Sequence, residues 1–441
     1  MSPLCIIPPG MHSILLSVFL LSGLAAVADE PAISIQDGEV LSLQRCVAIA
    51  LARDPDLRGL GYAADAADAR LLQARSQYLP SASATAGYQK NDAVKRNLED
   101  PYRSPALNTF DDKTVGVSVS ELIFDFGKRY SSVKAARFLR DAARSQRDSL
   151  AVKVAADVKQ AYYAVLQAKR ARALRSEMVE QFKQHLSVAR TRFEAGVRPK
   201  YFVTKAETDL STAELDFLRA DKELQVAQAV LAAAMNFFSA PAFDIVDTLD
   251  FEKYEAELDD ILAKAFSTRQ DLQALSEQTK AAGKSLAAAR GDLFPAFYAT
   301  AGYQFAGSRA PLSNGWNAGV NVTADLFSGF RKIGELSEAK DFLRQTETKV
   351  ESLRRQIGLD ARKAFLALQE AEKAIKTATQ GRGQAKENLE IAETNYTTGS
   401  GTPVEVTDAA VLYSNASMSL ISALYDYRVA RANIEKTMGM R

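Results

Sequence analysis

The chain contains two copies of one long unit, and this duplication restricts its possible folds more than any other feature. The stretch ARSQYLPSASATAGYQ at 74–89 returns as ARGDLFPAFYATAGYQ at 289–304, so equivalent residues differ by 215 in number. Further along, VGVSVSELIFDFGKR (115–129) matches AGVNVTADLFSGFRK (318–332) with an offset of 203. A period this long exceeds that of a solenoid repeat and predicts a pseudo-symmetric pair of units.

The ends of the two copies define the predicted domains. Ile14 to Leu24 is a short apolar core, and the small residues Ala26-Val27-Ala28 follow it, as in a cleavable export signal. The alternative is an apolar N-terminal helix. We expect no membrane-spanning helix further along the chain. The predicted segments are a signal peptide over 1–28, the first repeat over 29–236, a linker over 237–257 and the second repeat over 258–441.

Each repeat is predicted to contain a helix, two strands, a very long helix and a last helix. Apolar residues recur at three- and four-residue steps along the long helices, and no proline interrupts them. At 1.5 Å per residue, each long helix would measure on the order of 100 Å. We expect a bend at Gly381-Arg382-Gly383, because glycine is a poor helix former. In chain order, the predicted elements are 42–78, 80–90, 114–124, 128–195 and 203–236, then 258–292, 295–306, 316–327, 331–398 and 405–438.

The four predicted strands alternate between apolar and small polar residues. In the last one, Val320 and Val322 point one way, while Asn321 and Thr323 point the other. Such alternation is typical of a membrane β-barrel with lipid outside and water inside, and also of an antiparallel sheet with one buried face. Export and the nearly uncharged polar face favour the barrel. Four strands cannot close one, so we expect a dimer with 8 strands or a trimer with 12.

A proline precedes the first strand of each repeat. Pro80 and Pro295 occupy equivalent positions, and each follows a predicted helix. The proline ring clashes with the preceding helical turn, so it ends the helix. We therefore predict that Pro80 and Pro295 mark the two corners at which a helix reaches the membrane and becomes a strand.

The ordered, duplicated set of these motifs resembles the outer membrane efflux proteins, the TolC-like family. The carrying motifs are the repeated ARxxxxPxxxATAGYQ, the corners IFDFGKR (123–129) and LFSGFRK (326–332), and the turns RFEAGVRPKYFVTKAE (192–207) and NYTTGSGTPVEVTDAA (395–410). The resemblance implies a mainly α-helical protein with a membrane β-barrel portion. It implies a homotrimer whose 12-stranded barrel lies in outer-membrane lipid and continues into a long α-helical barrel in the periplasm.

The resemblance also implies a function and partners. Such a protein is a passive duct of a tripartite efflux or type I secretion system, and it exports small molecules or polypeptides. It docks a periplasmic adaptor, the membrane fusion protein, which connects it to an inner-membrane pump or ABC transporter. The cargo is not specified by the sequence.

The two turns between helices would be the periplasmic tips of such a duct. Gly196 and Gly399 suit a helix C-terminal cap, which needs positive φ. By resemblance, Glu405 and Asp408 lie at the duct entrance, where carboxylates from three chains attract cations; the alternative is that they only stabilise a helix N-terminus. The predicted gate residues are Glu405, Asp408 and Tyr396. The predicted adaptor contacts are Gly196, Val197, Phe202, Val203, Gly399, Val404 and Val406.

The tips depart from the family pattern at three positions. Gly401 stands where some relatives carry a basic gating residue, and Tyr201 and Phe202 stand where its polar partners would be. We therefore expect apolar packing rather than ion pairs to hold the gate.

Charge and histidine content argue against other functions. The formal net charge of +1 gives no basis for binding nucleic acid. Of the two histidines, His12 lies in the predicted signal peptide and His185 on a long helix. With no catalytic motif, we expect neither an enzyme, nor a metal site, nor a cofactor. A soluble periplasmic coiled-coil scaffold or adaptor is the alternative function, because it would share export, long helices and tip turns.

Overall fold

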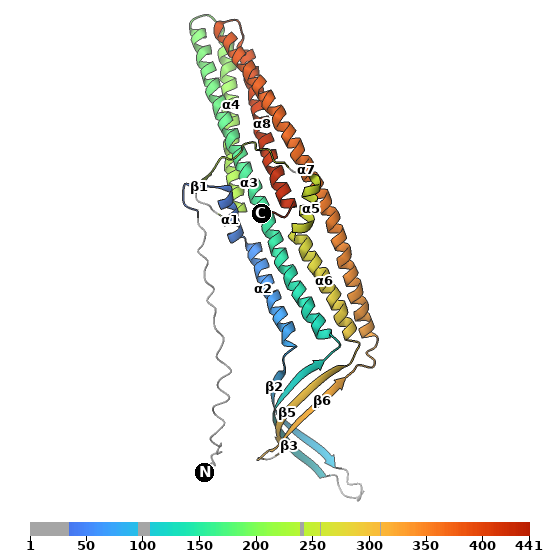
Figure 1. Cartoon of the computed structure of the whole chain (residues 1–441). Helices are drawn as coiled ribbons and strands as arrows, with labels where there is room; N and C mark the ends of the chain where they lie inside the picture. The colour runs from blue at the N-terminus through green and yellow to red at the C-terminus, as the bar shows by residue number, and fades with distance from the viewer. Residues whose placement is uncertain (1–34, 96–105, 239–241, 256, 309) are drawn as a thin grey trace, which may run out of the picture.

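The computed structural model shows an elongated, mainly helical protein with four long strands at one end (Figure 1). It describes residues 35–95, 106–238, 242–255, 257–308 and 310–441. The predicted signal peptide over 1–28 lies outside the described residues. Among the described helices, none combines the length and the apolar composition needed to cross a bilayer.

The two repeats have the same order of main elements. The first contains β1 (Glu39–Leu41), α1 (Leu43–Arg53), α2 (Pro55–Ser76), β2 (Ser81–Lys95), β3 (Ala106–Phe124), α3 (Lys128–Glu194) and α4 (Lys200–Ala234). The second contains β4 (Phe243–Ile245), α5 (Leu258–Thr268), α6 (Gln270–Gly291), β5 (Ala296–Gly307), β6 (Ser313–Thr323), α7 (Arg331–Thr398) and α8 (Pro403–Thr437).

The long helices agree closely with their predicted limits, but two details of the helix predictions are wrong. The first helix of each repeat is split in two, at Asp54 and at Arg269, where the backbone is extended. At the first break, the Asp54 side chain accepts a hydrogen bond from Leu57 N, and Pro55 begins the next helix. At Gly381 and Gly383 no interruption occurs, because α7 continues through both glycines while packed along α8.

The four long strands form one antiparallel sheet in the order β2-β3-β5-β6. The first hairpin is longer than the second: β2 and β3 have 15 and 19 residues, whereas β5 and β6 have 12 and 11. The change of offset from 215 to 203 reflects extra residues between the two strands of the first copy, and part of these residues extends the strands beyond the second hairpin.

A second, two-stranded sheet was not predicted. β1 and β4 pair in parallel, with Leu41 opposite Ile245. This pair lies beside α3, where the Tyr162 hydroxyl donates a hydrogen bond to Val246 O at 2.7 Å. β4 thus ties the predicted linker over 237–257 to the middle of the helical body.

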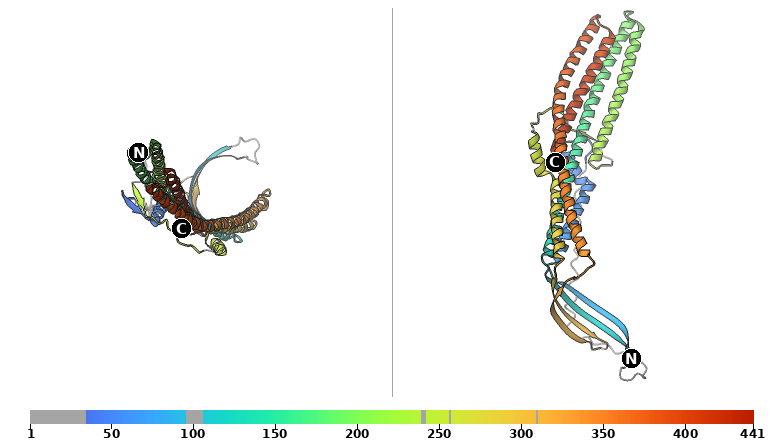
Figure 2. Two further views of the ribbon diagram at one scale, coloured as in Figure 1. Left: turned by 90° about the horizontal axis from the view of Figure 1, so that it is seen from above. Right: turned by 90° about the vertical axis from the view of Figure 1, so that its right-hand side faces the viewer.

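The helices and the main sheet form a curved wall with two open edges (Figure 2). Near the strands the helices contact one another in the order α2-α3-α6-α7, and near the tips in the order α4-α3-α8-α7. One edge of the wall therefore consists of β2, α2 and α4, and the other of β6 and α7. The best-buried residues form clusters between neighbouring helices of this wall.

Candidate functional site

The first tip is the turn between α3 and α4. Gly196 is left-handed, with φ of 73°, and Val197 N returns a hydrogen bond to Arg192 O at 3.0 Å. Val197 is exposed at the end of the turn, and Phe202 is half-buried. Among the residues of this repeat that were predicted to contact an adaptor, Val197 is therefore the one whose apolar side chain is exposed.

The second tip is the turn between α7 and α8. Gly399 is left-handed, with φ of 90°. Thr402 and Glu405 form a capping box: Thr402 N donates to the Glu405 carboxylate at 3.2 Å, and Glu405 N donates to Thr402 Oγ1 at 3.4 Å. Asp408 is exposed and makes no hydrogen bond or ion pair with the residues that the structure describes. The helix N-terminus thus engages Glu405 and leaves Asp408 facing solvent.

Two predicted adaptor contacts are contradicted by their burial. Val406 is 1% exposed and packs with Tyr396, while Val203 packs with Leu186 and Ala189. The two valines are equivalent in the repeats, and helical periodicity turns both inward. Neither can present its side chain to a partner. Val404, on the other face of α8, is exposed.

Tyr396 belongs to the packed interior of the tips rather than to an open entrance. Its ring is buried among side chains of α3, α7 and α8. The Arg192 guanidinium lies 4.5 Å from the centre of this ring and donates to Tyr396 O and Thr397 O at 3.1 and 3.2 Å. Arg192, on the first repeat, therefore caps the carbonyl end of α7 on the second. The sequence analysis did not identify this residue.

A second contact crosses between the tips of the two repeats. Thr407 Oγ1 on α8 donates to the Asp209 carboxylate on α4 at 3.0 Å, and Lys205 Nζ donates to the same carboxylate at 2.5 and 2.7 Å. These side chains surround a small space beside Phe182 and Val406. Apolar packing and polar contacts thus lie side by side at the tips.

A third contact between the tips of the two repeats involves His185. Its Nε2 lies 3.7 Å from the Glu393 carboxylate on α7. Burial lowers the pKa of His185 below its usual 6.5, although the charges of Glu393 and Asp209 act in the opposite direction. The imidazole is therefore neutral at pH 7.

Gly401 is required by close packing at the second tip. A Cβ at this position would lie 3.0 Å from the backbone of Asn395 and Tyr396. Gly401 N donates to Asn395 O at 2.9 Å, which holds the turn against the end of α7. A larger side chain at position 401 would therefore press against this turn.

The corners between strands and helices lie at the opposite end of the helical body. Pro80 and Pro295 each stand directly before a strand, after a short turn that follows α2 or α6. Where strands lead back into helices, the backbone is left-handed at Phe126 and at Phe330, with φ of 53° and 64°. Bulky residues rarely adopt this conformation, so both corners are tightly constrained turns.

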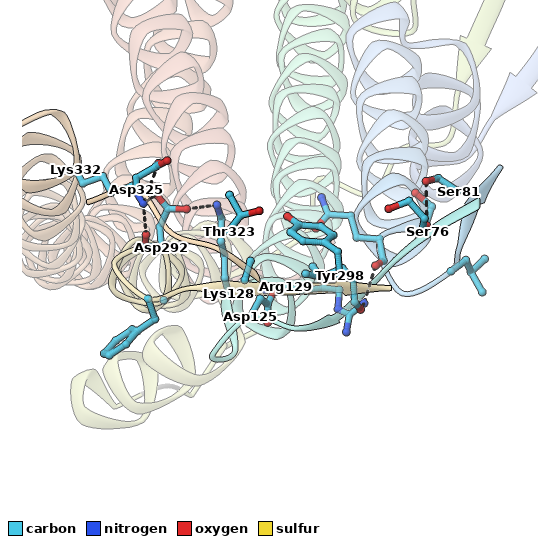
Figure 3. Close-up of a pocket in the computed structure, with 17 residues that line it drawn as sticks. Ser76, Ser81, Asp125, Lys128, Arg129, Asp292, Tyr298, Thr323, Asp325 and Lys332 are labelled. Carbon is cyan, nitrogen blue, oxygen red and sulfur yellow. Dashed lines mark hydrogen bonds and ion pairs between the residues drawn. The ribbon is translucent and has the colours of Figure 1, made fainter. Parts of the chain in front are cut away.

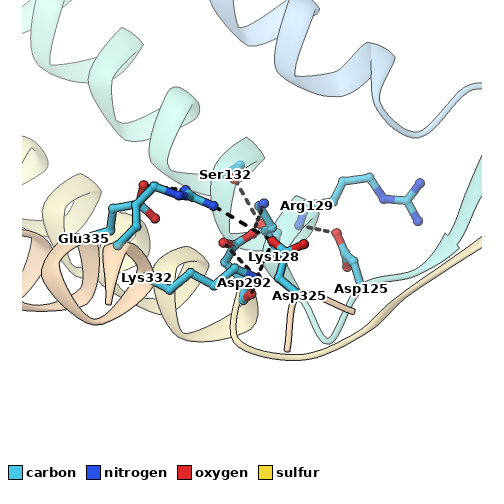
Figure 4. Close-up of polar contacts among 9 residues, drawn as sticks. Asp125, Lys128, Arg129, Ser132, Asp292, Asp325, Lys332 and Glu335 are labelled. Atoms are coloured by element: carbon cyan, nitrogen blue, oxygen red, sulfur yellow. Dashed lines mark hydrogen bonds and ion pairs between the residues drawn. The ribbon is translucent and has the colours of Figure 1, made fainter. Parts of the chain in front are cut away.

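Charged side chains of both repeats meet at the corner between α6 and β5 (Figures 3 and 4). Asp292 pairs with Lys128 from α3 and lies 3.6 Å from Lys332 Nζ of α7, which also contacts Asp325 at 3.2 Å. Burial raises the pKa of Asp292, but the hydrogen bonds and charges of the two lysines outweigh it, so the net pKa is lowered. These groups line a cavity of about 600 Å³ at the base of the sheet.

The polar face of the sheet is hydrogen-bonded across its strands. Ser83 and Ser118 hydroxyls lie 2.9 Å apart, and Asn321 Nδ2 donates to Thr300 Oγ1 at 2.9 Å. On the other face, Val117, Val320 and Val322 are exposed. The alternation predicted from sequence thus yields one polar and one apolar surface. In the described part of the chain, no group of three or more His, Cys, Asp or Glu residues is arranged to hold a metal ion.

A curved wall that joins a helical body to a two-faced sheet is the architecture of a channel-wall subunit, and comparisons with known proteins agree. The model of the outer membrane efflux protein family matches residues 47–236 and 261–440. The chain is 24% identical to the toluene efflux pump outer membrane protein TtgC of Pseudomonas putida, over 90% of this chain and 83% of that protein. It is 25% identical to the outer membrane protein TolC of Vibrio cholerae, over 88% of both chains.

Solved structures share the fold. The open-state MtrE outer membrane channel of Neisseria gonorrhoeae superposes with a TM-score of 0.76 at 22% identity, over 90% of this chain and 89% of that chain. CusC gives 0.79 at 17% identity, over 93% and 96%. The chain belongs to the outer membrane efflux protein family. It is an outer-membrane efflux channel protein with a periplasmic helical part, and the alternative of a periplasmic scaffold is not supported.

Proposed function

We propose that three copies of this chain close edge to edge into one duct of a tripartite efflux or type I secretion system. The two repeats, 29–236 and 258–441, would each form one sixth of the duct wall, with the linker over 237–257 bracing its outside. Twelve strands would form the barrel, and the long helices would continue it through the periplasm. The relatives named as efflux pump outer membrane proteins support this assignment.

The open edges of the sheet carry this proposal. Among the strands that the structure describes, β2 pairs with β3 alone, and β6 with β5 alone. Each unpaired strand edge leaves backbone N–H and C=O groups without partners, which costs several kcal/mol per group in lipid. Closing the sheet with further copies satisfies these groups. Eight strands would fill their own interior with side chains, whereas twelve leave room for a channel.

The edge helices support the same assembly. Apolar side chains are exposed along both edges of the wall, although a monomer in water gains nothing from exposing them. On one edge these are Tyr62 and Leu72 of α2 with Leu218, Val226 and Val230 of α4, and on the other they are Ile333, Phe342 and Leu366 of α7. Burying them between copies would extend the wall of helices into a closed barrel.

The tips are proposed as the adaptor contact and the gate. Val197, Tyr201 and Val404 are exposed apolar side chains at the far end of the helices. They suit a periplasmic adaptor that links the duct to an inner-membrane pump or ABC transporter. Glu405 and Asp408 would face the entrance, where Asp408 is free to attract cations. Specificity for small molecules or polypeptides would reside in the pump.

Fractionation of expressing cells tests the proposal. We expect heat-modifiable trimers in the detergent-extracted outer membrane, and discrete ion-conducting steps when the purified protein is added to planar lipid bilayers. A salt-soluble periplasmic pool with no channel activity would contradict the proposal.

A further inference from the structure

We infer that the concave face of the wall carries an anion-binding site where the end of α8 meets the break between α5 and α6. Its ligand would be a small solute with several carboxylate or phosphate groups. Arg269, Lys363 and Lys436 supply positive charge around a hollow of about 430 Å³, a volume typical of small-molecule sites. One carboxylate, two neutral polar side chains and two alanines complete the lining: Asp360, Asn433, Thr437, Ala364 and Ala367.

Carboxylates of the same chain engage these three cations only in part. The Arg269 guanidinium donates through Nε and Nη2 to Asp271 at 3.0 and 2.6 Å, which leaves Nη1 without an acceptor among the described residues. Lys436 Nζ lies 3.9 Å from Asp157, a long distance for an ion pair, and both side chains are exposed. Within the described part of the chain, Lys363 makes no ion pair or hydrogen bond. An anion in the hollow would therefore meet donors that can bind it.

Arg269 occupies a position where the first repeat has a helix cap. Its equivalent is Asp54, and the backbone is extended at both residues, with ψ of 120°. Asp54 accepts a hydrogen bond from Leu57 N and so caps α2, whereas no side-chain hydrogen bond caps α6 at Arg269. The second repeat thus carries a cation where the first carries a carboxylate that stabilises a helix N-terminus. The break itself does not require the arginine.

The two lysines also have uncharged equivalents. Lys363 and Lys436 correspond to Gln160 and Ala233, 203 residues earlier. A lysine in the last turn of α8 interacts favourably with the helix dipole, but α4 ends at the equivalent place with no basic residue in its last turn. Both junctions form, so the positive charge at the second exceeds what the fold needs, as expected of a binding site.

The two sides of the hollow are held together without a ligand. Thr268 Oγ1, at the end of α5, donates to Met438 O, just after α8. Gly439 is left-handed, with φ of 71°, and a Cβ there would lie 3.2 Å from the Arg269 backbone. The end of α8 therefore lies directly against the break. Cations held in place in this way bind an anion at a lower entropic cost than mobile ones.

The hollow opens on the concave face. α5 and the β1–β4 pair lie on the convex side of the wall (Figure 2). On α8, Tyr427 faces that side, because its hydroxyl donates to Glu252 O of the linker at 2.7 Å. Lys436 follows about two and a half helical turns later, so it points the opposite way. In the proposed duct the concave face lines the interior, and this part of the inference rests on the proposed function.

Binding of citrate to the detergent-purified protein tests the site itself. Radiolabelled citrate is measured by equilibrium dialysis, with inorganic pyrophosphate as the phosphate counterpart and acetate as the monovalent comparison, all at equal ionic strength. The site variant is Lys363→Gln with Lys436→Gln. The control is Lys373→Gln with Lys376→Gln, which removes the same charge from exposed positions of α7 outside the hollow.

Wild type and control should bind citrate or pyrophosphate alike, and the site variant should bind it roughly tenfold more weakly, because two of three cations are gone. Acetate should also bind roughly tenfold more weakly than citrate. Equal binding by the site variant and wild type, an equal loss in the control, or equal binding of acetate would overturn the site.

Single-channel recordings in planar bilayers test the position of the site. Citrate should lower the mean conductance of wild type and control, and the site variant should need roughly tenfold more citrate for the same reduction. If citrate bound in dialysis but left conductance unchanged, the placement on the duct interior would be overturned. A protein that binds citrate with the expected dependence but forms no channels would contradict the proposed function and leave the site standing.

Discussion

At the strand end of the helical body, lysines from both repeats converge on Asp292, whereas at the tips the contacts between repeats join a charged group to neutral ones. Arg192 donates to carbonyl oxygens, Asp209 accepts from the Thr407 hydroxyl, and Glu393 faces a neutral His185. At the corner one carboxylate lies between two lysines, whereas each contact between repeats at the tips joins a single charged group to a neutral partner. We therefore propose that the corners fix the wall and that the tips are the end able to open.

Removing Asp292 should have the largest effect on stability. Asp292→Ala leaves Lys128 and Lys332 close together without their shared carboxylate, at a cost of roughly 1–3 kcal/mol. We expect a lower apparent Tm for the detergent-purified protein, measured by circular dichroism. Asp341→Ala is the control, because Asp341 pairs with Arg344 one turn away on an exposed helix face, at 3.3 Å. Equal shifts in the two variants would contradict the special role of the corner.

Removing Arg192 should open the tips. Arg192→Ala deletes two hydrogen bonds to α7 carbonyls and the contact with the Tyr396 ring, together about 1–2 kcal/mol. We expect higher mean single-channel conductance in planar bilayers. Arg190→Ala is the matched control, because Arg190 pairs with Glu207 inside the first repeat, at 2.9 Å. If both variants raised conductance alike, the contact between repeats would not be what holds the tips.

The carboxylates proposed to face the entrance should have a smaller effect on conduction. Glu405→Gln with Asp408→Asn removes two charges per chain while the new amide oxygen at 405 can still accept from Thr402 N. We expect increased conductance or weaker cation preference, measured from reversal potentials in a salt gradient. Glu214→Gln, on an exposed face of α4, is the control. Unchanged conductance and selectivity would leave these residues only a capping role.

The smallest effect concerns His185. Its folded pKa lies below 6.5, so the folded state binds fewer protons, and stability is lost as pH falls through and below this value. His185→Asn should therefore reduce the loss of unfolding free energy between pH 7 and pH 5 by less than about 1 kcal/mol, which is measured as a smaller fall of the apparent Tm. If the Tm of the variant depended on pH as the Tm of the wild type does, burial of His185 would not couple the stability of the tips to pH.

The sequence predicted the elements whose signals are local and repeated. Alternation placed Thr300 and Asn321 on one polar face, and their hydrogen bond confirms that placement. The periodicity of apolar residues and the absence of proline predicted the long helices α3 and α7. The break at Asp54 carries a local signal, since Asp54 caps a helix that Pro55 begins. The equivalent break at Arg269 lacks any proline, so only the first could have been read from sequence.

Contacts between segments that are distant in the sequence could not be predicted from local patterns. The pairing of β1 with β4 joins three-residue strands from different parts of the chain, and such short segments carry no periodic signal. Arg192 and Thr407 look like ordinary helix residues until folding brings the tips together. The burial of Val203 and Val406 follows from helical periodicity, whereas their closeness to the turns alone suggested an adaptor contact.

The native mass of the detergent-purified protein tests the central claim most directly, because one copy leaves both edges of the sheet unpaired. The account predicts a complex of three chains, each of 48.0 kDa less any cleaved signal peptide. A mass equal to that of a single chain, in a protein that stays soluble in water without detergent, would contradict it.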